Sequence, residues 1–336
     1  MANTMKAVPR GALGVAGRSL PMAKDSPKTR LPPWLRVELP TGSRHERYRS
    51  TNNAVTSNSL HTVCQEAQCP NIHECWSDGT ATVMIAGEVC TRGCRFCAVG
   101  TRKTPPPLNP NEPESLANAV ESMQLDHAVI TVVNRDDLPD GGASHYRSCL
   151  DAVRRRCPET SIEFLCSDLE GNLGALADLL EGVDIDVFAH NVECVPRMDS
   201  DVRDPRASFE LSLTILREAK RLRPNIRTKT SLMVGVGETD EEISDAMRVI
   251  HESGVDILTL GQYLAPSSRH LAIDRFVTPE QFELFANDAR HIGFRAVASG
   301  PLVRSSYQAR ELLAHALSVD ENNDDSMGAH GFTEGT

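Results

Sequence analysis

The sequence predicts an α/β fold in which parallel strands and helices alternate as a partial or full (β/α) TIM-like barrel. Short, nearly continuous apolar or β-branched runs are typical of strands that are covered on both faces. Helical stretches separate these runs, and repeated strand–helix units of this length imply a parallel sheet. Their number favours a barrel over an open Rossmann sheet, while a full and a partial barrel both stay open. The strands are expected at residues 82–86, 128–133, 161–165, 183–189, 228–234, 255–260 and 294–298, and the helices at 112–124, 144–156, 172–181, 207–222, 240–253 and 279–292.

Capping residues mark the ends of several of these helices. Thr278 offers a capping hydroxyl, and Pro279 occupies the first helical position, which it favours. Gly182, Gly254 and Gly293 each follow a helix and precede a strand, where a left-handed backbone is favoured. These signals place the helix ends independently of the apolar pattern.

The composition indicates a globular chain that binds neither nucleic acid nor membranes. The 336 residues are 40% hydrophobic, which is enough to bury a sizeable core. The net charge is −11, whereas nucleic-acid binding favours basic surfaces. No apolar run approaches the roughly 18 residues that a membrane span needs.

The barrel, expected over residues 81–300, has additions on both sides. Residues 1–30 are rich in Pro, Gly, Lys and Arg and predict a disordered lead-in, and residues 31–80 predict a cysteine-rich N-terminal extension. Residues 301–319 are expected to form a C-terminal segment, followed by a disordered acidic tail over 320–336. The lead-in lacks the apolar core of a secretory signal, which favours the cytoplasm. Its basic character leaves a transit peptide for a mitochondrial or plastid matrix as the alternative.

Ten cysteines are unevenly spaced: six lie between Cys64 and Cys97, and four follow singly. In a reducing compartment such clustering indicates metal ligands rather than disulfides. Cys90, Cys94 and Cys97 form a C-x3-C-x2-C triad just after the first expected strand. Three thiolates leave one iron of a four-iron cubane open to a chelating small molecule, whereas structural zinc usually takes four ligands. An iron–sulfur cluster is therefore favoured over zinc.

A second triad, Cys64, Cys69 and Cys75, precedes the first with C-x4-C-x5-C spacing and predicts a second cluster. The C-x3-C-x2-C spacing, with Phe96 before its last cysteine, resembles the signature of the radical S-adenosylmethionine (SAM) superfamily. The two triads, followed by Arg-Ser-Ser-Tyr at 304–307, resemble the lipoyl synthase family. The resemblance covers about residues 31–312 and includes the stretches 135–142, 189–193 and 299–303.

The resemblance implies an enzyme that inserts two sulfur atoms into a protein-bound octanoyl-lysine to give lipoyl-lysine. It implies that the cluster on Cys90, Cys94 and Cys97 cleaves SAM reductively, and that the resulting radical removes hydrogen from the octanoyl chain. The other triad would hold an auxiliary cluster that is consumed as the sulfur donor, with Ser306, or else Ser305, as its fourth ligand. A helix-capping serine is the alternative for this stretch.

The resemblance also implies partners. Octanoylated lipoyl domains of 2-oxoacid dehydrogenase E2 subunits and the glycine cleavage H protein would carry the substrate. Flavodoxin or ferredoxin would supply electrons, and an iron–sulfur cluster carrier would rebuild the auxiliary cluster. Two alternatives are another radical SAM sulfur-inserting enzyme and a non-enzymatic electron carrier with two clusters, which a SAM-cleavage assay distinguishes from an enzyme.

Candidate SAM contacts follow the expected strands, since loops at that end of such a barrel face the active site. Closely spaced glycines let a backbone approach a ligand. Besides Phe96, the candidates are Asp140, Gly141, Gly142, Asn191, Glu193, Gly235 and Gly237. The alternatives are a plain Pro-Asp-Gly turn at 139–141 and a helix-entry turn at 235–239. At 166–169, Cys-Ser-Asp-Leu departs from the family's usual Thr-Pro-Asp-Phe-like string, although Asp168 is kept.

Overall fold

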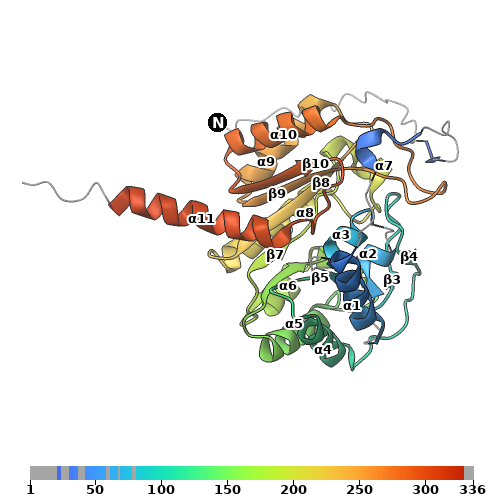
Figure 1. Cartoon of the computed structure of the whole chain (residues 1–336), viewed down its shortest axis with the longest axis vertical. Helices are drawn as coiled ribbons and strands as arrows, with labels where there is room; N and C mark the ends of the chain where they lie inside the picture. The colour runs from blue at the N-terminus through green and yellow to red at the C-terminus, as the bar shows by residue number, and fades with distance from the viewer. Residues whose placement is uncertain are drawn as a thin grey trace, which may run out of the picture.

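A computed structural model describes residues 21–23, 30–36, 42–57, 61–66, 69–77 and 81–328. Its centre is an eight-stranded sheet against which the helices pack, and a small helical extension lies beside it (Figure 1). A separate two-stranded sheet joins β3 (Val89–Cys90) to β4 (Gly100–Thr101). The predicted α/β class is confirmed.

The strands of the main sheet follow one another in sequence order, β1-β2-β5-β6-β7-β8-β9-β10. β1 pairs antiparallel with β2, and every later neighbour is parallel. Over the described residues the first and last strands do not pair with each other, so the barrel is partial. The strands are β1 His61–Thr62, β2 Thr82–Ile85, β5 His127–Val132, β6 Ser161–Leu165, β7 Val187–Ala189, β8 Arg227–Val234, β9 Ile257–Gln262 and β10 Ala296–Gly300.

Six helices occupy the predicted stretches and bury one apolar face each. Leu116, Leu150, Leu216 and Ile250, from four of these helices, share one core with sheet residues such as Ile130. The structure also adds a short helix, α7 (Asp199–Val202), after β7. The six are α4 Glu112–Met123, α5 Ala143–Arg156, α6 Leu173–Leu180, α8 Phe209–Leu222, α9 Asp240–Glu252 and α10 Pro279–Ile292.

The N-terminal extension contains helices that the apolar pattern did not predict: α1 (Ser43–Ser57), α2 (Val63–Glu66) and α3 (Ile72–Ser77). They gather around Trp76, which is fully buried. The Tyr48 ring stacks on it with centroids 5.4 Å apart, and Thr51 Oγ1 donates to its carbonyl oxygen at 2.9 Å. One aromatic side chain therefore organises this small second core.

The two ends of the chain differ from the expected disorder where the structure describes them. Residues 21–23 lie along the barrel, since Met22 bridges to Leu271 and the Ala23 N–H donates to the carbonyl of His270 at 2.8 Å. Helix α11 (Ala309–Gly328) runs past the boundary expected at residue 319 (Figure 1). Residues 1–20, 24–29 and 329–336 lie outside the described residues.

Helix α11 begins against the inner side of the sheet. Its Leu312 and Ala316 form a small apolar cluster with Ile257 and Ala296 of β9 and β10. Among the described helices, none combines the length and apolar character needed to cross a membrane.

Candidate functional site

The loop that carries Cys90, Cys94 and Cys97 lies at the carboxyl edge of the sheet, where it is anchored to the loops after other strands. The Thr91 N–H donates to the carbonyl of Asn134 at 3.0 Å, after β5. The Arg95 N–H donates to Val202 at 2.9 Å, and the Arg95 carbonyl accepts from Leu271 at 3.0 Å. Three separate barrel loops therefore fix the position of this triad.

The three thiols of this loop are free and half-buried. Backbone N–H groups point at two of them: Arg92 N lies 3.4 Å from Cys90 Sγ, and Asp204 N lies 3.3 Å from Cys94 Sγ. Burial raises the pKa of Cys94 to about 11 and that of Cys97 to about 12. Buried thiolates need a compensating cation, which bound iron would supply.

The two cysteine triads are not gathered as closely as the ligands of a single ion. Thiolates on one tetrahedral zinc lie about 3.8 Å apart, given a Zn–S distance of about 2.3 Å. In the described part of the chain, the one group of three ligand atoms that all lie within 4.8 Å of one another is Glu112, His145 and Cys149. Neither cysteine triad forms such a group, and a four-iron cluster, in which each thiolate binds a different iron, does not require one.

A buried network of charged side chains, which the sequence did not reveal, anchors the Cys90–Cys97 loop to the loops after two other strands. The Arg92 guanidinium donates to Asp168 at 2.5 Å and to Asp136 at 2.9 Å, and all three side chains are nearly inaccessible. Burial alone would raise the pKa of Asp168, but the hydrogen bond and charge of Arg92 hold it below its usual value. Arg206 adds a bond to Asp136 at 2.9 Å. The one hint in the sequence was Arg92 itself, a charged residue between Cys90 and Cys94.

Two candidate SAM contacts, Asn191 and Glu193, lie just after β7 and face the same loop. Glu193 adopts a positive φ of 66° and bridges to Leu232 of β8. Asn191 Nδ2 donates to the Glu193 carboxylate at 3.1 Å. Burial raises the pKa of Glu193, and its charge contributes to the raised pKa values of Cys94 and Cys97. The structure thus brings this carboxylate close to the triad.

The glycine-rich candidates have roles within the protein itself. The Asp140 carboxylate accepts from the Gly142 and Ser144 N–H groups, at 2.9 Å each, and so caps helix α5. A Cβ on Gly142 would lie 2.7 Å from the Tyr146 ring, and one on Gly235 would lie 2.3 Å from the Gln262 amide. Gly141 and Gly237 also have positive φ, and Phe96 packs against the main core. Cofactor binding by these residues stays a prediction.

The other triad is built on the short helices of the extension. Cys64 lies on α2 and Cys75 on α3, and the Cys69 N–H between them donates to the Cys64 carbonyl at 3.0 Å. The Asn71 side chain ties this loop to the C-terminal segment, because its Nδ2 donates to the carbonyl of Leu302 at 2.6 Å. Burial raises the pKa of Cys69.

The stretch at 304–307 lies against this triad and against the barrel. Burial lowers the pKa of Arg304, which the neighbouring Cys69 thiol partly opposes. The Tyr307 hydroxyl donates to Glu74 at 3.3 Å, and Thr82 Oγ1 of β2 donates to Ser306 Oγ at 2.9 Å. Segments more than 200 residues apart therefore meet here, as the predicted serine role requires. The choice between Ser305 and Ser306 stays a prediction.

Comparison with known proteins gives the family. Residues 84–250 match the model of the radical SAM superfamily, and residues 16–69 match the model of the N-terminal domain of lipoyl synthase. The chloroplastic lipoyl synthase of Arabidopsis thaliana is 49% identical over 302 residues, covering 88% of this chain and 76% of the relative. The lipoyl synthase of Marinobacter nauticus is 48% identical over 318 residues, covering 94% and 86%.

More distant likeness supports the fold alone. The FeFe-hydrogenase maturase HydG from Carboxydothermus hydrogenoformans superimposes with a TM-score of 0.52 at 12% identity, covering 81% of this chain and 69% of the maturase. The mitochondrial lipoyl synthase of Homo sapiens, by contrast, is 47% identical and covers 86% of this chain and 78% of the relative. At nearly half identity over most of its length, this chain belongs to the lipoyl synthase family of radical SAM enzymes.

Proposed function

We propose that this enzyme makes lipoyl-lysine from a protein-bound octanoyl-lysine with two separate cysteine sites. Cys90, Cys94 and Cys97 would hold the [4Fe–4S] cluster that binds SAM. Cys64, Cys69 and Cys75, with a serine of the C-terminal segment, would hold the auxiliary [4Fe–4S] cluster. When bound, SAM and the two clusters supply a strong hydrogen-abstracting agent and the sulfide that is inserted. The observation that carries the proposal is the meeting of the auxiliary triad with residues 302–307 beside strand β2.

The residues of the chain supply positioning and exclusion of water. Anchoring the Cys90–Cys97 loop to three barrel loops keeps the triad in one place, which radical chemistry requires of its reacting groups. Glu193 and Asn191 offer a carboxylate and an amide beside that triad, suited to the ribose or the amino group of SAM. Burial of Cys64 and Trp76 keeps water away from the auxiliary site.

Thr82 prepares Ser306 for a ligand role. Its hydroxyl donates to Ser306 Oγ at 2.9 Å, and a donated hydrogen bond favours negative charge on the accepting oxygen. An alkoxide binds iron more weakly than a thiolate does, so a serine corner suits a cluster that gives up sulfur. We assign the fourth ligand to Ser306 on this basis.

The test separates the two sites by substitution. Purified protein is incubated anaerobically with SAM, dithionite and an octanoyl-lysyl peptide, and the products are measured by mass spectrometry. The Cys90/Cys94/Cys97→Ala variant should lose both 5′-deoxyadenosine and sulfur insertion. The Cys64/Cys69/Cys75→Ala variant should keep SAM cleavage and lose insertion. Cys157→Ala, at a half-buried cysteine outside both triads, is the control. Insertion by either triple variant would refute the assignment.

The substrate is carried by lipoyl carrier proteins, for which we propose E2 subunits and the glycine cleavage H protein. For the electron donor we propose flavodoxin or ferredoxin. A hollow of about 580 Å³ beside Thr91 and Gly93 is lined by both basic and acidic side chains, among them Arg102, Lys103 and Glu170, so its charge does not select between the donors. A cluster carrier would rebuild the auxiliary site after each turnover. Binding of each partner is measurable by titration calorimetry.

For the compartment we propose the cytoplasm, with a mitochondrial or plastid matrix as the alternative. Pro9, Gly11 and Gly14 interrupt the apolar core that a secretory signal needs. The clustering of six cysteines in two triads suits a reducing compartment, where such cysteines serve as metal ligands rather than as disulfides. Cell fractionation of the tagged full-length chain tests this proposal.

A further inference from the structure

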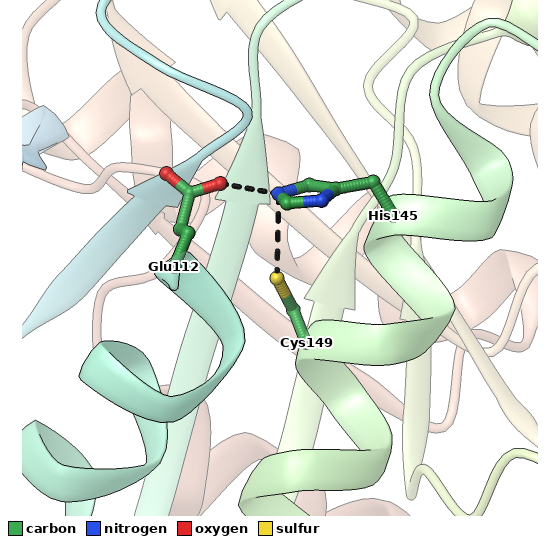
Figure 2. A group of neighbouring side chains, drawn as sticks. All are labelled: Glu112, His145 and Cys149. Atoms are coloured by element: carbon green, nitrogen blue, oxygen red, sulfur yellow. Dashed lines mark hydrogen bonds and ion pairs between the residues drawn. The ribbon is translucent and has the colours of Figure 1, made fainter. Parts of the chain in front are cut away.

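Three side chains outside both cysteine triads lie together between helices α4 and α5 (Figure 2). Glu112 is the first residue of α4, and His145 and Cys149 lie on neighbouring turns of α5. His145 Nε2 is 2.5 Å from Glu112 Oε2 and 3.7 Å from Cys149 Sγ. Cys149 is fully buried, and Glu112 is nearly so. This donor set is one that a transition metal could use.

The carboxylate is already engaged inside the protein. The Ala86 N–H donates to the same Glu112 oxygen, at 2.8 Å, that contacts His145. His145 Nε2 can therefore act as a donor to Glu112, and this carboxylate oxygen then accepts two hydrogen bonds. Such a paired arrangement satisfies the buried carboxylate, which would otherwise be costly. The three side chains thus form a hydrogen-bonded network that reaches the backbone N–H of Ala86.

Ala86 occupies a demanding position in the chain. It follows the last residue of β2 and begins the turn that leads to Cys90, with a φ of +68°. Residues with a Cβ seldom adopt this left-handed conformation, and they keep it only where their surroundings impose it. Gly87 continues the turn with a φ of +94°, and Arg135 Nη1 donates to the Ala86 carbonyl at 3.2 Å. The backbone N–H and the carbonyl of Ala86 are therefore both held by polar side chains.

We propose that Glu112, supported by His145, is a positioning residue for the Cys90–Cys97 loop. By holding Ala86 in the left-handed turn, the carboxylate sets the direction in which the chain leaves β2 and hence where the triad sits. The inference rests on the proposed function of that loop as the SAM-binding cluster site. Neither side chain touches the triad, so the effect acts through the backbone.

The test uses the anaerobically purified enzyme with both clusters. Glu112→Ala should decrease SAM cleavage about tenfold or more and should decrease the change that SAM produces in the electron paramagnetic resonance spectrum of the reduced protein. Glu112→Gln keeps one acceptor oxygen at the start of α4. It should therefore decrease SAM cleavage less than Glu112→Ala does. Glu114→Ala is the matched control, because Glu114 lies in the same first helical turn with its side chain 60% exposed. The auxiliary cluster signal should stay intact in all three.

The decisive variant is Ala86→Gly in the Glu112→Ala background. Glycine adopts a positive φ without strain, so it should restore at least half of the lost SAM-dependent signal. A defect that glycine does not relieve would mean that Glu112 only stabilises α4, and an unchanged signal in Glu112→Ala would equally overturn the proposal. The proposal would also be overturned if the purified protein contained stoichiometric zinc that Cys149→Ser removes. The three side chains would then be metal ligands.

The outcome also distinguishes this inference from the function on which it rests. If the Cys90/Cys94/Cys97→Ala variant keeps the SAM-dependent signal, the cluster assignment fails, whatever Glu112 does. If that variant loses the signal while Glu112→Ala keeps it, only the positioning role fails.

Discussion

The two cysteine sites are built in opposite ways. The Cys90–Cys97 loop belongs to the barrel and is held by hydrogen bonds from three other barrel loops and by the buried pairs of Arg92. The Cys64–Cys75 site is assembled from two remote segments, an N-terminal extension and the stretch at 302–307, that meet beside β2. Under the proposed function, the site that would stay intact over many turnovers is part of the sheet's own loops, whereas the site that would be spent and rebuilt is closed by a segment more than 200 residues away in the sequence.

The largest expected effect is a loss of stability on removing the buried charges that hold the Cys90–Cys97 loop in the barrel. Arg92→Leu leaves the Asp168 carboxylate buried without its ion-pair partner and leaves Asp136 paired with Arg206 alone, which should decrease the free energy of unfolding by about 3–5 kcal/mol. Urea unfolding measures the change. Arg155→Leu, at a side chain that is 67% exposed, should stay within about 0.5 kcal/mol of the parent. A similarly small change for Arg92→Leu would show that the network does not hold the loop.

The next largest effect concerns the Cys64–Cys75 site and its predicted serine ligand. Ser306→Ala should decrease sulfur insertion at least about a hundredfold, equivalent to about 2.7 kcal/mol of activation free energy, while SAM cleavage continues. Ser305→Ala is the matched variant and should keep most of the insertion activity. The product ratio of lipoyl peptide to 5′-deoxyadenosine is the measurement. The opposite ranking of the two serines would move the ligand role to Ser305.

A pH series sharpens the comparison, because two buried histidines of the barrel, His127 and His190, make its stability depend on pH. Burial lowers the pKa values of His127 and His190 to about 4, below the value of about 6.5 expected in the unfolded chain. The unfolded state therefore binds protons that the folded state does not, so stability is complete above pH 6.5 and falls as the pH decreases towards 4. At pH 5 each histidine should cost about 2 kcal/mol.

The measurement is the free energy of unfolding at pH 7 and pH 5. His190→Gln should remove about half of the histidine contribution to the decrease. His291→Gln, at an exposed position, is the control. An unchanged pH dependence in His190→Gln would show that His190 is not held neutral by burial.

The smallest effect tests the link between the two sites. Thr82→Val removes the hydrogen bond to Ser306 while keeping the shape of the side chain, and should slow sulfur insertion about tenfold, or about 1.4 kcal/mol. Thr82→Ser keeps the donor and should restore the rate. Equal rates for the Val and Ser variants would exclude a role for the hydroxyl.

The strands and helices of the barrel were predictable because each has a local apolar pattern and local caps. The Thr278 cap, for example, appears as expected, with its hydroxyl accepting from Gln281 N at 3.3 Å. Helix α1 was not predictable, since Ser43–Ser57 is largely polar and is stabilised by packing of Tyr48 and Val55 around Trp76. Strand β7 is shorter than expected, Val187–Ala189, although Val183 and Ile185 are buried in the same core.

The cysteine triads were evident from spacing, but the charges around them were not. Arg92 and Asp168 are 76 residues apart, and no local pattern pairs them. The same holds for Glu112 and Ala86, whose relation depends on a backbone angle that only the folded chain displays. Sequence spacing identifies candidate ligands, whereas long-range pairing determines how the loop that carries them is held.

The absence of pairing between β1 and β10 over the described residues has a consequence for how the chain could be divided. A chain cut after Gly300 would retain every parallel strand and the Cys90–Cys97 loop, yet would lack both candidate serines. If the proposed ligand roles hold, such a fragment would still consume its cosubstrate while leaving its client protein unmodified. Radical generation and sulfur supply would then be separable tasks, coupled by the last stretch of polypeptide.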